Sequence, residues 1–333
     1  REEYGDDRKS PIEERLDLTT EDLIKPEDMV VTISRLGYAK TQPLEVYQSQ
    51  RRGGVGKTAA SVKEEDFVEQ LIVANTHDTL LCFSNLGKVY WLKVYEIPQA
   101  SRIAKGRPLV NLIQLDTEER ITSLLNIESF DAAGFVFMAT VKGVVKKTPL
   151  EDFRLPRKNG KRAIKLDAKD ELVGTKITDG KQHIMLISDA GKAVYFDEKD
   201  SRPLGRDTRG VKGIDLSEEQ KVISLMVPSL EDEILTVSEN GYGKKSKIAD
   251  FRKTKRGAKG VIAMQLSERN GKLISAVQVL EEDEVILITD KGTLVRTKVS
   301  EISTFGRNTQ GVRVIKLKEN EKLNKLALAL EKD

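Results

Sequence analysis

Two series of glycines recur along this chain with a period close to 50 residues, and few folds accommodate such a pattern. The first series, each member of which ends an apolar, β-branched run, consists of Gly37, Gly87, Gly143, Gly191, Gly241 and Gly292. The second consists of Gly56, Gly106, Gly160, Gly210, Gly260 and Gly311, and five of these six lie 19 residues after their partner. An apolar run that ends in glycine predicts a strand and a tight turn, because glycine adopts positive φ at little cost. Each repeat is therefore expected to begin with a β-hairpin.

Two further strands are expected in each repeat. One follows the second glycine, at Ala163–Leu166, Val211–Leu216, Val261–Leu266 and Val312–Leu317. A closing strand follows the next polar turn, for example at Ile121–Leu125, Val222–Met226 and Leu273–Val277. Four strands in a repeat of about 40 to 50 residues are typical of blades that close into a ring. We expect an all-β, propeller-like ring of six four-stranded blades.

The blades are expected to fill residues 28–333 and to start near residues 29, 80, 135, 184, 234 and 285. The terminal strand Leu323–Leu330 would complete the last blade or meet the first. Residues 1–27 are charged and weakly helical, and the chain begins with Arg1 rather than Met. We expect this segment to be a leader or linker from an upstream domain.

The net charge of the chain is only +3, but it is distributed unevenly. In every repeat the segment between the two glycine regions is basic, with a net charge of +2 to +7 that is greatest in the fifth repeat, and the rest of the chain is acidic in sum. Equivalent segments of a radial array occupy equivalent places, so they should form a basic belt. Such a belt suits a curved polyanion. The alternative is that these lysines and arginines only protect strand edges from aggregation.

The segment Gln50–Lys57 concentrates this basic character. Arg51, Arg52 and Lys57 surround three glycines, whose backbone lets a phosphate approach closely while the guanidinium groups bind its oxygens in pairs. It is not an ATP-type phosphate loop, because no glycine lies five residues before Gly56 and no helix is expected to follow. A phosphate backbone is its expected partner.

Other chemistry is poorly represented. His77 and His183 are the only histidines and have no metal-ligand spacing, and no Ser/His/Asp set stands out. We therefore expect no metal, no catalytic residue and no cofactor in this chain, and no enzymatic activity of the chain alone. The single cysteine, Cys82, is expected in the core and indicates a reducing cytoplasm, and we predict neither a membrane span nor a signal peptide.

Aromatic side chains are expected to pack blades rather than to stack on bases. Tyr90, Trp91, Tyr95, Tyr195 and Tyr242 all lie in or beside hairpin strands. Contacts to a nucleic acid would then go to phosphates, which position it without reading its sequence.

The segment Gln50–Lys57, taken together with the six repeats, resembles the C-terminal domain of the DNA gyrase A protein, a type IIA DNA topoisomerase component. The family's box, Gln-Arg-Arg-Gly-Gly-Lys-Gly, is matched except that Val55 stands where the family usually has lysine. Lys57 is then the nearest substitute. The resemblance covers essentially the whole chain, and Arg1–Pro11 looks like the end of the helical arm of the upstream cleavage domain.

The resemblance implies a six-bladed β-pinwheel, in which neighbouring blades exchange strands and duplex DNA bends around the outer rim. It implies chiral wrapping that directs strand passage, so that the whole enzyme introduces negative supercoils using ATP. Tyrosine-mediated cleavage would belong to the upstream region, and ATP and magnesium to other parts of the holoenzyme. The implied partners are double-stranded DNA, the gyrase B protein and a second copy of the gyrase A protein, in the bacterial cytoplasm at the nucleoid.

The candidate DNA-binding residues follow from these considerations. The box residues are Gln50, Arg51, Arg52, Gly53, Gly54, Gly56 and Lys57. The rim residues are Lys105, Arg107, Lys146, Lys147, Arg162, Arg206, Arg209, Lys244, Lys245, Arg256, Lys259, Arg296 and Arg307. Two alternatives stay open: a topoisomerase IV-type C-terminal domain that selects DNA crossings without a full wrap, and a propeller that scaffolds proteins.

Overall fold

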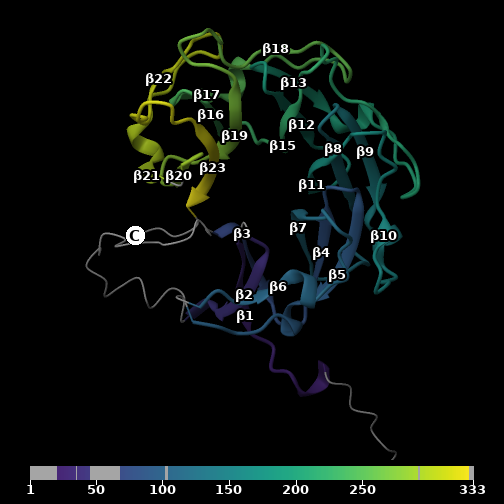
Figure 1. Ribbon diagram of the computed structural model, residues 1–333. Helices are drawn as coiled ribbons and strands as arrows, with labels where there is room; N and C mark the ends of the chain where they lie inside the picture. The colour runs from purple at the N-terminus through teal and green to yellow at the C-terminus, as the bar shows by residue number, and fades with distance from the viewer. Residues whose placement is uncertain (1–20, 35, 46–67, 102–103, 292, 330–333) are drawn as a thin grey trace, which may run out of the picture.

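The computed structural model of the protein describes residues 21–34, 36–45, 68–101, 104–291 and 293–329. These residues form six β-sheets that stand around a central opening (Figure 1). The expectation of an all-β ring of six blades is confirmed. The 3₁₀ turn η1 (Glu21–Leu23) precedes the first strand. The box Gln50–Lys57 lies outside the described residues, so its role stays a prediction.

Every sheet is built on a hairpin, and in the first five sheets the turn contains a glycine of the first series. At the second hairpin the Gly87 N–H donates to the Ser84 carbonyl at 3.0 Å, and Gly87 has a φ of +74°. This is the conformation that glycine adopts cheaply. The hairpins are β1 (Asp28–Ser34) with β2 (Tyr38–Pro43), β4 (Thr79–Ser84) with β5 (Lys88–Lys93), β8 (Phe135–Thr140) with β9 (Val144–Pro149), β12 (His183–Ser188) with β13 (Lys192–Asp197), β16 (Glu233–Ser238) with β17 (Tyr242–Lys247), and β20 (Glu284–Thr289) with β21 (Leu294–Lys298).

A closing strand pairs antiparallel with the first strand of each hairpin and faces the ring axis. In the second sheet, for example, Leu81 lies opposite Leu125. A hollow of about 490 Å³ is lined by all six of these strands. They are β3 (Val68–Asn75), β7 (Ile121–Ile127), β11 (Leu172–Thr178), β15 (Val222–Met226), β19 (Leu273–Val279) and β23 (Leu323–Ala329).

The outermost strand of each of the first five sheets comes from the following repeat. These two-residue strands are β6 (Arg107–Pro108), β10 (Lys161–Arg162), β14 (Val211–Lys212), β18 (Val261–Ile262) and β22 (Val312–Arg313). The first sheet, for example, has the order β3-β1-β2-β6, and within the described residues the sixth sheet has three strands, β21-β20-β23. Neighbouring blades therefore exchange strands, as the pinwheel architecture requires.

The glycines of the second series make this exchange possible. A Cβ at Gly210 would lie 2.6 Å from the Val145 carbonyl oxygen of the neighbouring sheet, and one at Gly260 would lie 2.4 Å from that of Ala193. Both glycines also have positive φ, at +100° and +79°. Any side chain at these positions would push the exchanged strand off its partner.

The exchanged strands are shorter than expected from the sequence, and the expected strand at Ala163–Leu166 is wrong. The strand there ends at Arg162, because the N–H groups of Ala163 and Ile164 both turn to the Gly87 carbonyl, at 2.8 and 3.2 Å. The chain then enters the space between two blades, where both side chains are at most 1% exposed. These apolar residues are interblade core rather than strand.

Cores form between adjacent blades. Between the second and third blades, Phe83 and Phe153 pack edge to face with ring centroids 5.8 Å apart, and both are fully buried. Full burial of such a side chain stabilises the fold by about 2 to 3 kcal/mol. Tyr90, Tyr195 and Cys82 are buried too, which confirms the expected packing role of these residues. Burial raises the pKa of the Cys82 thiol to about 12.

A 3₁₀ turn follows the second hairpin strand in five repeats and buries its first residue. The turns are η2 (Val94–Glu96), η4 (Leu150–Phe153), η5 (Glu198–Asp200), η6 (Ile248–Asp250) and η7 (Val299–Glu301), and η3 (Leu109–Asn111) follows β6. Glu198 is 0% exposed where the other turns have Val, Leu or Ile, and its Oε2 has no hydrogen-bond partner. The fourth blade thus carries a buried carboxylate in an apolar position.

Candidate nucleic-acid interface

The basic segments of the second to sixth repeats form loops on the outer edge of the ring (Figure 1). Each loop leaves the 3₁₀ turn of its own repeat and runs beside the second hairpin strand of the preceding blade, as the bridges Lys147↔Pro203 and Lys245↔Thr304 record. It ends in the exchanged outer strand. The described repeats therefore carry basic side chains to the same edge of the first five blades.

Five of the predicted rim residues, Lys105, Arg107, Arg162, Arg209 and Lys259, are exposed on this edge. The same loops expose basic side chains that the sequence argument did not single out. These are Arg157, Lys158, Arg202, Arg252, Lys253 and Lys255. The signal for them was the charge of the whole loop, because no individual spacing distinguishes them.

Two exposed arginines lie in weak ion pairs that a phosphate can replace. Arg162 Nη1 lies 2.7 Å from Asp207 Oδ1, and Arg209 Nη2 lies 2.5 Å from Asp167 Oδ2. The arginine side chains are 57% and 63% exposed, and such surface pairs contribute little, typically about 0 to 1 kcal/mol. The hydrogen bond from Arg162 lowers the pKa of Asp207. The guanidinium groups are thus held in place without being neutralised strongly.

Three half-buried arginines make the same bond in successive blades. Arg206, Arg256 and Arg307 each donate from Nη1 to a carbonyl of the exchanged strand next to them, at Arg162, Lys212 and Ile262. These arginines fix the loop to the neighbouring blade, so they shape the edge as well as charging it. Arg296 is also exposed, and its Nε donates to the carboxylate of Glu284 within the sixth blade.

The structure corrects the placement of Lys146 and Lys244 on the exposed rim, because both are 0% exposed. Lys146 Nζ donates to the carbonyls of Ala163, Arg206 and Thr208, the last two in the next loop. Burial lowers the pKa of Lys146 to about 7 and that of Lys244 to about 8. These ammonium groups organise the loops from below and are not available to a phosphate.

The same arrangement recurs in alternate blades. Lys244 Nζ donates to the carbonyls of Gly306 at 2.7 Å and Arg307 at 2.6 Å. Lys40, at the equivalent position of the first blade, donates to Ser101 and Ala104 at 3.2 and 2.9 Å. The sequence argument missed Lys40, although it shares the third place after a hairpin glycine with the other two.

Lys147 and Lys245 are also buried, at 4% and 2% exposed, and their placement on the rim is corrected in the same way. Lys147 Nζ donates to the Glu198 carbonyl at 3.1 Å. Lys245 forms ion pairs with Glu233 at 3.0 Å and Glu281 at 2.5 Å. Consecutive residues of a strand point to opposite faces of the sheet. Both faces of these blades are covered by neighbouring elements, so both lysines of each pair are buried.

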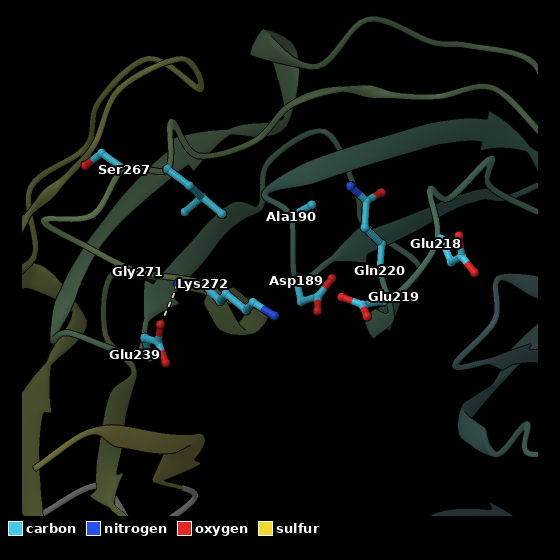
Figure 2. A pocket seen from close by; sticks show the side chains of 10 residues that line it. Asp189, Ala190, Glu218, Glu219, Gln220, Glu239, Ser267, Gly271 and Lys272 are labelled. Atoms are coloured by element: carbon cyan, nitrogen blue, oxygen red, sulfur yellow. Dashed lines mark hydrogen bonds between the residues drawn. The ribbon is translucent and has the colours of Figure 1, made fainter.

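A hollow beside the hairpin turns of the fourth and fifth blades is acidic. It has a volume of about 500 Å³. Asp189, Glu218, Glu219 and Glu239 line it, with Lys272 among them (Figure 2). The Lys272 N–H donates to Glu239 Oε1 at 3.1 Å. These carboxylates disfavour a polyanion inside this hollow.

The described ranges contain neither a membrane-spanning helix nor a cluster of metal ligands. No helix there has the length and apolar character needed to cross a membrane. No group of three or more His, Cys, Asp and Glu side chains in those ranges is placed to hold a metal ion.

Comparison with known proteins gives consistent results. A sequence model of the family described as "DNA gyrase C-terminal domain, beta-propeller" matches residues 28–75, 78–128, 134–179, 182–229, 232–279 and 283–329. The DNA gyrase A protein of Salmonella typhimurium is 51% identical over 322 residues, which cover 96% of this chain and 37% of the relative. This chain therefore spans little more than a third of the relative's length.

Two solved structures are also similar. The C-terminal domain of DNA topoisomerase IV has a TM-score of 0.79 and 28% identity, over 92% of this chain and 94% of that domain. A DNA gyrase A C-terminal domain has a TM-score of 0.71 and 28% identity, over 91% of this chain and 99% of that domain. The fold is common to both kinds of topoisomerase domain.

Proposed function

This chain belongs to the DNA gyrase C-terminal domain family, and we propose that it binds duplex DNA along the basic outer edge of its ring. The observation that carries this proposal is the placement of the basic loops, which reach the same edge in successive blades. Phosphate contacts of this kind hold DNA regardless of its sequence.

The ring bends the DNA that it holds. Smooth bending of about 20 to 30 base pairs by 40 to 90° costs on the order of 1 to 6 kcal/mol. No single loop offsets that cost, so contacts must be distributed over several blades. The exposed residues Arg162, Arg209 and Lys259 represent three successive loops. Arg51 and Arg52 of the box are proposed to anchor the strand at the first blade.

Within the whole enzyme the bend becomes a chiral wrap that presents a second DNA segment for strand passage, and negative supercoiling follows. This chain supplies the DNA path and no catalysis. ATP, magnesium and the cleavage tyrosine belong to other regions of a complex with the gyrase B protein and a second copy of the gyrase A protein. The complex works on the nucleoid in the bacterial cytoplasm.

A topoisomerase IV-type role is the second candidate, because the fold resembles that enzyme's C-terminal domain at least as well. Such a domain would bind crossings without wrapping. The strong sequence relation to the gyrase A protein over 96% of the chain favours the wrapping role.

The proposal is tested with a duplex of about 40 base pairs that carries a fluorophore at each end. Binding should bring the ends together, and affinity should fall steeply as salt rises through about 50 to 200 mM. A duplex that binds but stays straight would favour the topoisomerase IV-type role. No binding at the lowest salt would leave a protein scaffold as the better account.

A further inference from the structure

Two arginine side chains contact the same tyrosine, Tyr242, in the fifth blade. Tyr242 begins β17 and is only 5% exposed. Arg269 donates from Nε to the Tyr242 hydroxyl oxygen at 3.1 Å, and Arg313 donates from Nη2 to the same oxygen at 3.3 Å. The two guanidinium carbons lie 4.8 and 5.7 Å from the ring centroid. Because both arginines are exposed, the buried phenol presents two guanidinium groups to solvent side by side.

Both arginines are held by well-anchored backbone. Arg313 lies in β22, the outer strand that the sixth repeat lends to the fifth sheet. Arg269 lies in the loop before β19, and its carbonyl accepts a hydrogen bond from Asn240 Nδ2 at 3.2 Å. Asn270, which is fully buried, ties that loop to the carbonyl of Gln310 at 3.3 Å. Two repeats thus fix the pair before any ligand arrives.

The charge of this cluster is not balanced. Neither guanidinium makes an ion pair within the part of the chain that the structure describes, whereas Arg162 and Arg209 each have a carboxylate partner. Two like charges that share one acceptor repel each other, and an anion between them would offset that repulsion. The Tyr242 oxygen accepts both bonds, so its own proton is available for a third partner. The two arginines also lower the pKa of the phenol, which makes it a better donor.

We propose that Arg269, Tyr242 and Arg313 form a clamp for one phosphodiester group of bound duplex DNA, a site that rests on the DNA-binding function proposed above. Guanidinium forks match the paired oxygens of a phosphate. Arg313 has the same place in its exchanged strand as Arg162 has in β10, on the edge along which the other basic residues follow one another. Arg269 reaches it from the loop beside the hairpin turn of the fifth blade, so the clamp lies where the outer edge meets the side of the ring that carries the hairpin turns. It marks where the DNA passes from the fifth blade to the sixth.

The test compares the salt dependence of duplex binding by the whole chain and by variants. In Arg269→Gln with Arg313→Gln, the slope of log affinity against log salt should become shallower by about 0.9, because the variant loses one phosphate contact. Each single substitution should cause most of the change in slope that the double substitution causes, since the two side chains share one phosphate. The matched control is Arg120→Gln with Lys142→Gln, which removes two exposed charges that already have partners, the Glu171 carboxylate and the Ala168 carbonyl, and should leave the slope unchanged.

A second measurement locates the contact. Duplexes that each carry one neutral methylphosphonate linkage should bind the wild-type chain more weakly at one linkage position, and the double variant should be insensitive at that position. Unchanged slope and affinity in the double variant, with binding by the wild type intact, would overturn the clamp and leave the proposed function standing. Absence of duplex binding by the wild type would overturn both. Thermal unfolding of each variant checks that the exposed substitutions leave the fold intact.

Discussion

Substitution of Lys146 by methionine probes the buried lysines beneath the loops. Lys146 is 0% exposed and donates to three carbonyls, one of its own repeat's exchanged segment and two of the next loop. Methionine fills a similar volume but carries neither charge nor donor. The variant therefore removes one titrating group while keeping most of the packing.

The magnitude follows from proton linkage. Burial lowers the pKa of Lys146 from 10.5 to about 7. Between these values the unfolded chain binds one proton more than the folded chain, so the stability of the wild type rises with pH by about 1.4 kcal/mol per unit. Methionine does not titrate, and all other groups are common to both proteins. The free energy of unfolding of the wild type minus that of the variant should therefore increase by about 2.5 kcal/mol between pH 7 and pH 9.

Urea unfolding followed by the fluorescence of Trp91, the single tryptophan, measures this difference at pH 6, 7, 8 and 9. Below pH 7 the difference should change little, because the lysine is then mostly charged in both states. Lys158→Met, an exposed lysine of the same repeat, is the control and should show no pH dependence in this range. A difference that stays constant from pH 6 to pH 9 would refute the reasoning, since it would mean that the three carbonyls keep the ammonium charged.

Three further substitutions test other parts of the account. Gly210→Ala should destabilise the chain by about 2 to 5 kcal/mol in urea unfolding, because its Cβ would lie 2.6 Å from the Val145 carbonyl oxygen and the residue has positive φ. Gly205→Ala is the control and should be nearly neutral, because a Cβ there would meet open space. Equal effects of the two substitutions would contradict the role of the second series of glycines. Glu198→Leu should raise the free energy of unfolding by about 1 to 2 kcal/mol, since an apolar side chain replaces a carboxylate that has an unpaired buried oxygen. A lowered melting temperature would contradict this, because it would mean that the contacts of Glu198 outweigh the cost of burying its charge. Arg209→Gln should lower the salt slope of duplex binding by about 1, measured by fluorescence anisotropy, and an unchanged slope would remove this residue from the DNA path.

The repeat could be predicted from sequence because its signals are local. A glycine such as Gly87 takes positive φ in a hairpin turn wherever the surrounding strands go, so the period of the glycines gives the number of blades directly. The strand exchange could not be predicted from the sequence pattern. A pattern indicates that the residues after Gly210 form a strand, but it does not indicate which strand they pair with. The structure shows that they pair with β9, a strand about 65 residues earlier in the chain.

The candidate interface was predicted in part for a related reason. A basic residue in a loop, such as Arg209, is exposed because the loop is on the surface. A basic residue in a strand is different, because its exposure depends on what covers that strand. Lys146 and Lys147 look like a rim contact in sequence, but loops and turns from about 50 to 60 residues further on cover both faces of the strand. The distribution of basic residues therefore predicted the correct edge of the ring, but it overestimated how many of those residues are exposed to solvent.

The measurement that tests the central claim most directly uses relaxed circular DNA. The chain is bound to the circles, topoisomerase I relaxes the unconstrained DNA, and a gel that resolves the sign of the linking difference follows removal of the protein. The proposed role in negative supercoiling predicts trapped positive supercoils, in an amount that grows with protein bound and falls with salt. Binding without any change in linking number would contradict wrapping.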